Sequence, residues 1–154
     1  MEKDFHMPEI RKGSSRLLRK GRFSQSGQIY LVTTATLQRR KVFADFEAAR
    51  LLVNILRIES ASGSCKTLAF VVMPDHLHWL VQLEQGALSV VVGRVKSISA
   101  KRLGRPVWQD GFHDRALRSD DDLPALARYV VTNPLRAGLV KRVGLYPHWD
   151  AVWL

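Results

Sequence analysis

A hairpin of two strands is predicted by the segment Phe70–Leu83, and this segment limits the possible folds more than any other. The apolar run Thr67–Met73 has the unbroken hydrophobic character of a buried strand. Pro74 and Asp75 then favour a tight turn, because both residue types suit turn geometry. The apolar pattern resumes at once in His76–Leu83, where it indicates a second strand. Two strands joined by so short a turn pair antiparallel, so the fold contains an antiparallel hairpin.

Two histidines lie one residue apart at the start of this second strand. Because side chains alternate along a strand, His76 and His78 share one face, while Leu77 and Trp79 lie on the other. Two neutral imidazoles side by side can share one metal cation. Asp75, just before the pair, either orients one of the histidines or only completes the turn. The alternative for the pair itself is two half-exposed strand residues without a ligand.

Strand and helix patterns alternate along the chain in the order β-α-β-β-α-β, followed by a further helix. This order is that of the ferredoxin-like split βαβ plan, an α+β fold with an antiparallel sheet. Two helices cover one face of such a sheet, so the histidines are expected on the opposite, open face. The elements expected outside the hairpin are a strand at Gln28–Thr36, helices at Asp45–Ala61 and Ala87–Arg102, a strand at Val107–Leu117 interrupted near Gly111, and a helix from Ser119–Asp122 to about Asn133.

One domain with an N-terminal extension is expected. Residues 1–27 are polar, basic and rich in Gly and Ser, which predicts an extended arm, and residues 28–154 are expected to form the domain. Its tail, Gly138–Leu154, contains apolar and aromatic residues that should pack back on the body. The longest wholly apolar run, Leu68–Met73, is too short to span a membrane, and the N-terminus lacks a signal-peptide pattern. These features predict a cytoplasmic protein.

The formal net charge of +10 favours a polyanionic partner, nucleic acid before an anionic membrane. The alternative is a generally basic, soluble surface. Clustering of the basic residues favours nucleic acid, and the first cluster shows no amphipathic lipid-binding helix. The candidate DNA-binding residues of the arm are Arg11, Lys12, Arg16, Arg19, Lys20 and Arg22. Further basic clusters are Arg39-Arg40-Lys41 and, in the second expected helix, Arg94, Lys96, Lys101 and Arg102, of which Arg94 and Lys101 are DNA-binding candidates.

A tyrosine near the end of the last expected helix is the candidate nucleophile. Tyr129 and Asn133 are four residues apart and therefore lie on the same face of a helix. A helix laid across the open sheet face would bring both towards His76 and His78. A tyrosine hydroxyl can attack a phosphodiester, and a cation held by the histidines and the Asn133 amide oxygen could polarise the scissile phosphate. The alternative is a tyrosine that packs its ring at the surface.

Two segments of the chain resemble the signature segments of the REP-associated tyrosine transposases. These proteins are relatives of the single-strand insertion-sequence transposases, in the HUH class of single-tyrosine endonucleases. The two segments are M-P-D-H-L-H-W-L (Met73–Leu80) and A-R-Y-V-V-T-N-P-L-R-A-G-L-V (Ala127–Val140). W-Q-D-G-F-H-D-R-A-L-R (Trp108–Arg118) and G-R-F-S (Gly21–Ser24) also resemble segments of that family, in the same order.

The resemblance implies a metal-dependent single-strand DNA endonuclease and strand transferase that acts at repetitive extragenic palindromic hairpins. It implies that His76, His78 and Asn133 hold Mg²⁺ or Mn²⁺, with Asn133 standing where the insertion-sequence relatives have a glutamine. Tyr129 would form a 5′-phosphotyrosine and leave a free 3′-hydroxyl. No nucleotide cofactor is needed, because the phosphotyrosine conserves the bond energy. The basic arm, with Gly21 and Ser24, is then expected to hold the hairpin and its flanking tetranucleotide.

The sequence is also compatible with a second function and with two oligomeric states. The alternative function is a non-catalytic single-stranded nucleic-acid or hairpin binder that uses the open sheet face. Against it, His76 and His78 occupy the region where a base-stacking aromatic pair would be expected. A degenerate, purely regulatory member would not need Tyr129 and Asn133 intact. We expect a monomer or a homodimer that is nucleoid-associated through its DNA partner.

Overall fold

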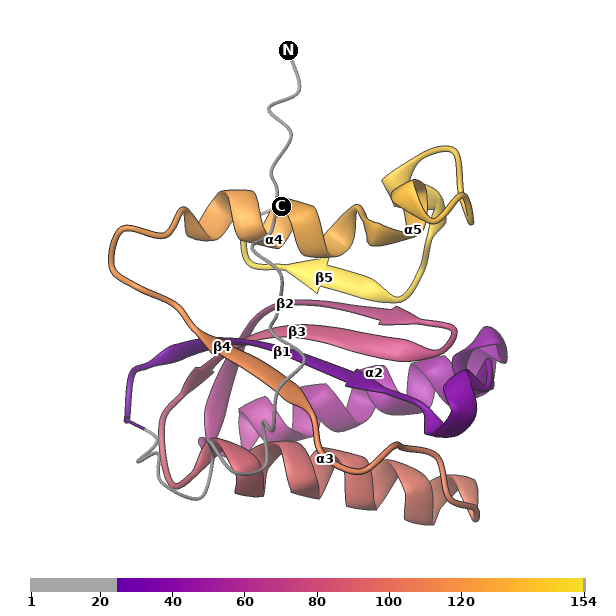
Figure 1. Cartoon of the computed structure of the whole chain (residues 1–154), viewed down its shortest axis with the longest axis horizontal. Helices are drawn as coiled ribbons and strands as arrows, with labels where there is room; N and C mark the ends of the chain where they lie inside the picture. Colours follow the sequence, from indigo (N-terminus) through magenta and orange to yellow (C-terminus); the bar gives the residue numbers. More distant parts are fainter. Residues whose placement is uncertain (1–24, 154) are drawn as a thin grey trace.

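A five-stranded antiparallel sheet forms the centre of the computed structural model, which describes residues 25–153 (Figure 1). The strand order across the sheet is β4-β1-β3-β2-β5. The predicted α+β class with an antiparallel sheet is confirmed, whereas β5 is a strand that the sequence pattern does not indicate. The strands are β1 (Ile29–Ala35), β2 (Cys65–Met73), β3 (His76–Leu83), β4 (His113–Ala116) and β5 (Trp149–Ala151).

Helices lie on both faces of this sheet, which gives three layers (Figure 1). On one face α2 (Phe46–Ala61) and α3 (Leu88–Leu103) pack against each other and against the strands. On the other face α4 (Leu123–Val131) crosses β2, β3 and β5 and continues into the short α5 (Asn133–Arg136). The face expected to be open is therefore partly covered by the helix that was expected to cross it. Three short 3₁₀ turns are η1 (Leu37–Arg39), η2 (Val42–Ala44) and η3 (Val143–Leu145).

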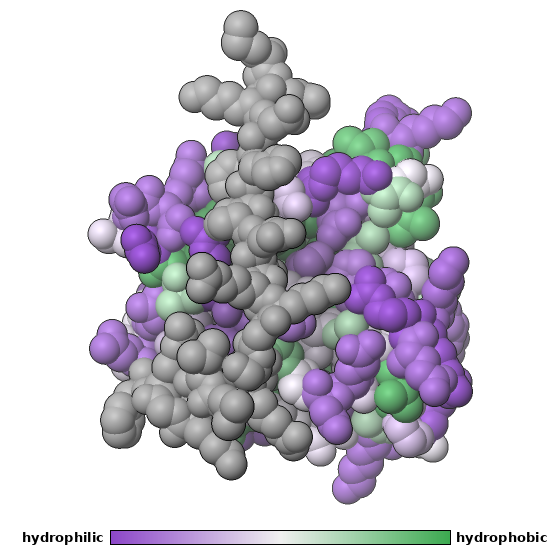
Figure 2. Space-filling model, in the orientation of Figure 1, coloured by the Kyte–Doolittle hydropathy of each residue, from purple (hydrophilic) through white to green (hydrophobic). Residues whose placement is uncertain are grey.

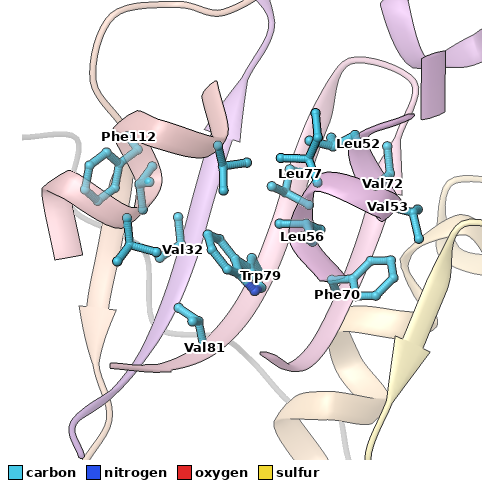
Figure 3. Packing of buried hydrophobic residues seen from close by; sticks show 14 of the residues in the cluster. Val32, Leu52, Val53, Leu56, Phe70, Val72, Leu77, Trp79, Val81 and Phe112 are labelled. Carbon is cyan, nitrogen blue, oxygen red and sulfur yellow. The ribbon is translucent and has the colours of Figure 1, made fainter. Parts of the chain in front are cut away.

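The larger hydrophobic core lies between the sheet and the helices α2 and α3, with Trp79 near its middle (Figure 3). Trp79 is fully buried, and its indole Nε1 donates a hydrogen bond of 3.0 Å to Thr67 Oγ1. Leu77 and Val81 alternate with the polar positions of β3 and point into the same core. This alternation is the one predicted from the sequence, and it turns His76 and His78 to the opposite face.

A second, smaller core lies on that opposite face, beneath α4. Leu126 and Val130 of α4 pack there against Leu31, Val71 and Leu80 of the sheet. The tail packs back on this side as expected, because Tyr146 and Trp149 join the cluster. The Tyr146 hydroxyl also donates a hydrogen bond to the Val72 carbonyl.

The strand expected at Val107–Leu117 is interrupted near Gly111, as predicted. Only His113–Ala116 forms the regular strand β4, while Trp108 makes an isolated bridge with Thr36. Gly111 has a φ of +74°, a left-handed conformation that favours glycine. The Lys96 ammonium donates hydrogen bonds to the carbonyl oxygens of Gln109 and Gly111, which stabilises the irregular loop.

The tyrosine-bearing helix begins at its predicted cap but ends at Val131, before the predicted limit near Asn133. Asp122 caps α4, because its Oδ1 accepts a hydrogen bond of 3.0 Å from the Ala125 amide. Pro134 has no amide hydrogen to donate to the Val130 carbonyl, so the helical hydrogen bonding is interrupted: α4 ends at Val131 and a new turn begins at Asn133. No helix in residues 25–153 has both the length and the apolar character needed to cross a bilayer.

Candidate metal centre and nucleophile

The two histidine rings of β3 meet edge to face on the α4 side of the sheet. His76 Nε2 and His78 Nε2 are 3.1 Å apart, and the ring planes make an angle of 82°. The strand register explains this position, because β3 lies between β1 and β2 and both neighbours hold its backbone. The predicted pairing of the two histidines on one face is confirmed.

Each histidine also makes a polar contact through its other ring nitrogen, Nδ1. His76 Nδ1 is 2.7 Å from Asp75 Oδ1, and a carboxylate can only accept, so this nitrogen carries the proton. His78 Nδ1 is 2.9 Å from the hydroxyl oxygen of Thr33, its cross-strand neighbour on β1. Such backing hydrogen bonds fix the orientation of metal-binding histidines in proteins. They leave the two Nε2 atoms beside each other, 3.1 Å apart.

Both imidazoles are neutral at physiological pH. Burial lowers the pKa of His76 despite the opposing effect of Asp75. Burial lowers the pKa of His78 to about 3, and the charges of His76, Arg136 and Arg39 act in the same direction. Neutral rings keep a lone pair for a cation, so the electrostatics of the pair suit a ligand role.

Asp75 is itself held in its ionised form. Burial raises its pKa, but the hydrogen bond with His76 and the charges of His76 and Arg39 outweigh burial and lower the pKa overall. The Arg39 Nε atom lies 3.1 Å from Asp75 Oδ2. Arg39, Asp75, His76 and His78 therefore form a continuous chain of polar contacts across the end of the sheet.

The separation of the two Nε2 atoms fits a shared divalent cation. Two neighbouring ligands of an octahedral cation at about 2.1 Å lie about 3.0 Å apart. The histidine nitrogens are already 3.1 Å apart. Within residues 25–153 no group of three or more His, Cys, Asp or Glu side chains gathers around a cation site. Further ligands from this part of the chain would therefore be of another type, such as an amide oxygen, and water or a phosphate oxygen could complete the set.

Tyr129 and Asn133 lie on the same side of the sheet as the histidine pair, at the junction of α4 and α5. Tyr129 is half-buried in the last turns of α4, and Asn133 is the first residue of α5. The helix break at Thr132 separates the two residues, which the sequence pattern had placed on one continuous helix. The Asn133 side chain makes no hydrogen bond with either histidine among the described residues.

Arg136 links the tyrosine to the surroundings of the histidine pair. Its guanidinium lies over the Tyr129 ring, 4.0 Å from the ring centroid. Its Nη2 atom donates a hydrogen bond of 2.6 Å to the Tyr129 carbonyl, and its Nη1 atom bonds the Thr132 hydroxyl. Its charge is also one of those that lower the pKa of His78. The tyrosine, the arginine and the histidines therefore belong to one neighbourhood.

Of the remaining candidates, Arg94 and Lys101 are not brought to this site. Arg94 lies on α3, across the sheet from the histidines, and pairs with the buried Glu59 through Nη2–Oε1 and Nε–Oε1 contacts of 2.7 and 3.0 Å. Lys101 is exposed in the last turn of the same helix. The candidates of the arm, Arg11, Lys12, Arg16, Arg19, Lys20, Gly21, Arg22 and Ser24, lie outside the described residues.

The sequence did not identify Thr33 or Arg136 as residues of the site, and it did not reveal the role of Arg39 there. The contact of Thr33 with His78 depends on strand register, which no local pattern reveals. Arg39 belongs to a basic cluster that was noted only for its charge. Arg136 follows Tyr129 by seven residues, so two helical turns bring it to the same face, and this spacing could have identified it.

A histidine pair on one sheet face, with a tyrosine-bearing helix across that face, is the arrangement expected for a single-tyrosine DNA transposase. Comparison with known families agrees, because residues 24–132 match the family described as "Transposase IS200 like". The match covers more than half of the chain, and the protein belongs to this family.

Individual relatives point to one branch of the family. The chain is 30% identical over 82 residues to the REP-associated tyrosine transposase of Escherichia coli K12, covering 51% of this chain and 50% of that protein. A Haemophilus influenzae protein assigned provisionally to the same group is 25% identical over 100 residues, covering 54% and 57% of the two chains. The chain thus spans about half the length of the curated relatives it matches.

The fold is also shared with a solved structure, that of a REP-associated tyrosine transposase bound to a REP hairpin. The TM-score is 0.69 at 22% identity, and the likeness covers 83% of this chain and 79% of that one. At this identity the comparison supports the fold alone.

Proposed function

We propose that this protein is a metal-dependent single-strand DNA endonuclease and strand transferase that acts at repetitive extragenic palindromic hairpins. The observation that carries the proposal is the pair of Nε2 atoms 3.1 Å apart on the sheet face that the Tyr129 helix crosses. Neutral, oriented histidines supply cation ligands, and the tyrosine of the helix across the same sheet face supplies a nucleophile. The hairpin substrate is proposed from the REP-associated relatives, because the similar solved transposase is bound to a REP hairpin.

His76 and His78 would hold the cation, with the Asn133 amide oxygen as a third ligand after the hairpin DNA has entered. The donor set suits Mn²⁺ well, because imidazole and amide oxygen are both acceptable to it, and Mg²⁺ remains compatible. When bound, the cation would polarise the scissile phosphate and stabilise charge on the leaving oxygen. Asp75 and Thr33 keep the imidazoles aimed at that position.

The reaction exchanges one phosphodiester for another. The Tyr129 hydroxyl oxygen attacks the scissile phosphorus, the new O–P bond forms, and the bond between phosphorus and the 3′-oxygen breaks. The phenol loses its proton to solvent, and the leaving oxygen takes up a proton to become a 3′-hydroxyl. The DNA 5′ end remains on the tyrosine as a phosphodiester, so attack by a second 3′-hydroxyl rejoins DNA without a nucleotide cofactor.

Metal removal is expected to abolish formation of a covalent protein–DNA complex. The full chain is incubated with end-labelled single-stranded hairpin DNA and Mn²⁺, with or without EDTA, and then run on a denaturing gel. An SDS-resistant labelled band should form only with the metal, since an unaided phenol is a weak nucleophile at neutral pH. Tight hairpin binding without such a band across many hairpins would instead favour a non-catalytic hairpin binder.

Asp75→Asn is expected to weaken Mn²⁺ binding by about 10- to 100-fold, because the carboxylate fixes the His76 tautomer and ring orientation. Calorimetric titration of the DNA-free protein with Mn²⁺ measures this directly. Asp121→Asn is the matched control, because Asp121 pairs with Arg115 at 3.0 Å but contacts no histidine. Equal Mn²⁺ affinity of the two variants would remove Asp75 from the metal centre.

A further inference from the structure

Arg136 holds Tyr129 at two points at once. Its Nη2 atom is hydrogen-bonded to the Tyr129 carbonyl, while the guanidinium plane lies over the phenol ring of the same residue. A third contact, from Nη1 to the Thr132 hydroxyl, fixes the guanidinium to the end of α4. One rigid planar group therefore contacts both the backbone and the ring of the same residue.

The helix break explains why this arrangement is possible. Pro134 ends α4, and the last carbonyl groups of a helix attract cations and donor side chains. Arg136 reaches back from α5 to these groups at the C-terminal end of α4 and thereby spans the junction. The contacts of Arg136 are with the nucleophile's own residue and its helix, and no carboxylate of the described residues pairs with it.

We propose that Arg136 is a positioning residue for the nucleophile: it holds the Tyr129 ring relative to α4 and thereby sets the position of the attacking hydroxyl. This inference rests on the proposed function, since it concerns the orientation of the tyrosine that attacks DNA. Correct orientation of a reacting group is worth a large factor in rate, and a misplacement of about 1 Å can cost about 100-fold. Arg136 acts through Tyr129, so its loss should affect the chemical step rather than DNA binding.

Arg136→Met is expected to lower the rate of covalent adduct formation at saturating hairpin DNA and Mn²⁺ by about 10- to 100-fold. Methionine keeps an unbranched apolar stem but lacks the charge and the two hydrogen bonds. Arg136→Lys should recover part of the rate, because an ammonium also binds over an aromatic ring but lacks the planar fork. The dissociation constant for the hairpin, measured in EDTA, should change by less than about threefold, since at most one phosphate contact is involved.

Arg128→Met is the matched control. Arg128 is an exposed arginine of α4 next to Tyr129 in sequence, so its removal makes the same change in charge. Its adduct rate should equal that of the wild-type protein. An unchanged rate in Arg136→Met would overturn the proposal. The proposal would also be overturned if a higher DNA concentration restored the adduct rate of Arg136→Met, because that result would assign Arg136 to phosphate binding.

A spectroscopic experiment tests the ring position without any catalysis. The chain has three tyrosines, so the protein labelled with 3-fluorotyrosine gives a small set of ¹⁹F resonances, and Tyr129→Phe identifies the one from Tyr129. Arg136→Met should shift that resonance and leave those of Tyr30 and Tyr146 in place. An unmoved Tyr129 resonance would contradict the proposal. If the wild-type protein forms no adduct with any hairpin, the proposed function fails, whereas this measurement still reports on Arg136.

Discussion

Tyr129→Phe is expected to abolish the covalent protein–DNA adduct, with a loss of at least about 1,000-fold in its rate of formation. The substitution removes only the attacking oxygen. The ring stays, and with it the contact with the Arg136 guanidinium 4.0 Å from the ring centroid. Hairpin affinity should therefore remain within about twofold of the wild-type value, because no charged group is lost. The denaturing gel measures the adduct, and a native gel of the same samples measures binding.

Tyr146→Phe is the control for this experiment, because it deletes the same atom on the same side of the sheet. The Tyr146 hydroxyl donates to the Val72 carbonyl, and burial raises its pKa to about 12, so it is a poor nucleophile. We expect this variant to form the adduct at the wild-type rate. A Tyr129→Phe protein that still forms the adduct would show that another residue attacks the DNA. Loss of the adduct in both variants would point to a general defect instead.

The β-hairpin formed by β2 and β3 and the position of its two histidines could be predicted from the sequence, because their determinants are local. Pro74 and Asp75 specify the turn, and the alternation from His76 to Leu83 assigns each side chain to a face. The cap at Asp122 and the end of α4 before Pro134 are equally local signals. A candidate site made of residues near such signals can be identified without a structure.

The features that could not be predicted depend on contacts between distant segments. Thr33 contacts His78 only because β1 pairs with β3 in one particular register. The strand β5 has three residues, and it forms because β2 offers an edge to the returning tail. Phe46 and Ile98 fit the apolar periodicity of their helices, yet they are 59% and 37% exposed. Phe46 is the first residue of α2, and its ring lies against His148 of the tail rather than in the core.

The two faces of β3 have different roles: one face packs in the larger core, and the other carries the two histidines. Trp79 is fully buried in the larger core, while His78 lies on the other face against Thr33. A strand whose one face is anchored so firmly can present histidines in a fixed position on the other. The position of the metal centre should therefore depend on the core through the backbone of β3, and disruption of the core tests this dependence.

Trp79→Ala is expected to lower the free energy of unfolding by about 3–5 kcal/mol, which is a large part of the stability of a typical domain. It removes the largest fully buried side chain of residues 25–153 and the hydrogen bond from Nε1 to Thr67 Oγ1. Thr67 Oγ1 also accepts a hydrogen bond from Ser60 Oγ at 2.8 Å, so the cavity should account for most of the loss. Urea unfolding followed by circular dichroism measures the change.

Trp153→Ala is the control, because Trp153 is 39% exposed near the end of the tail and its removal should cost less than about 1 kcal/mol. Trp79→Phe separates the two contributions at Trp79, since phenylalanine fills part of the cavity but donates no hydrogen bond. If Trp79→Ala cost no more than Trp153→Ala, β3 would not be anchored through its core face. If the stability falls as expected, Mn²⁺ binding measured in the absence of urea should weaken together with it, because the histidines keep their positions only while β3 is held.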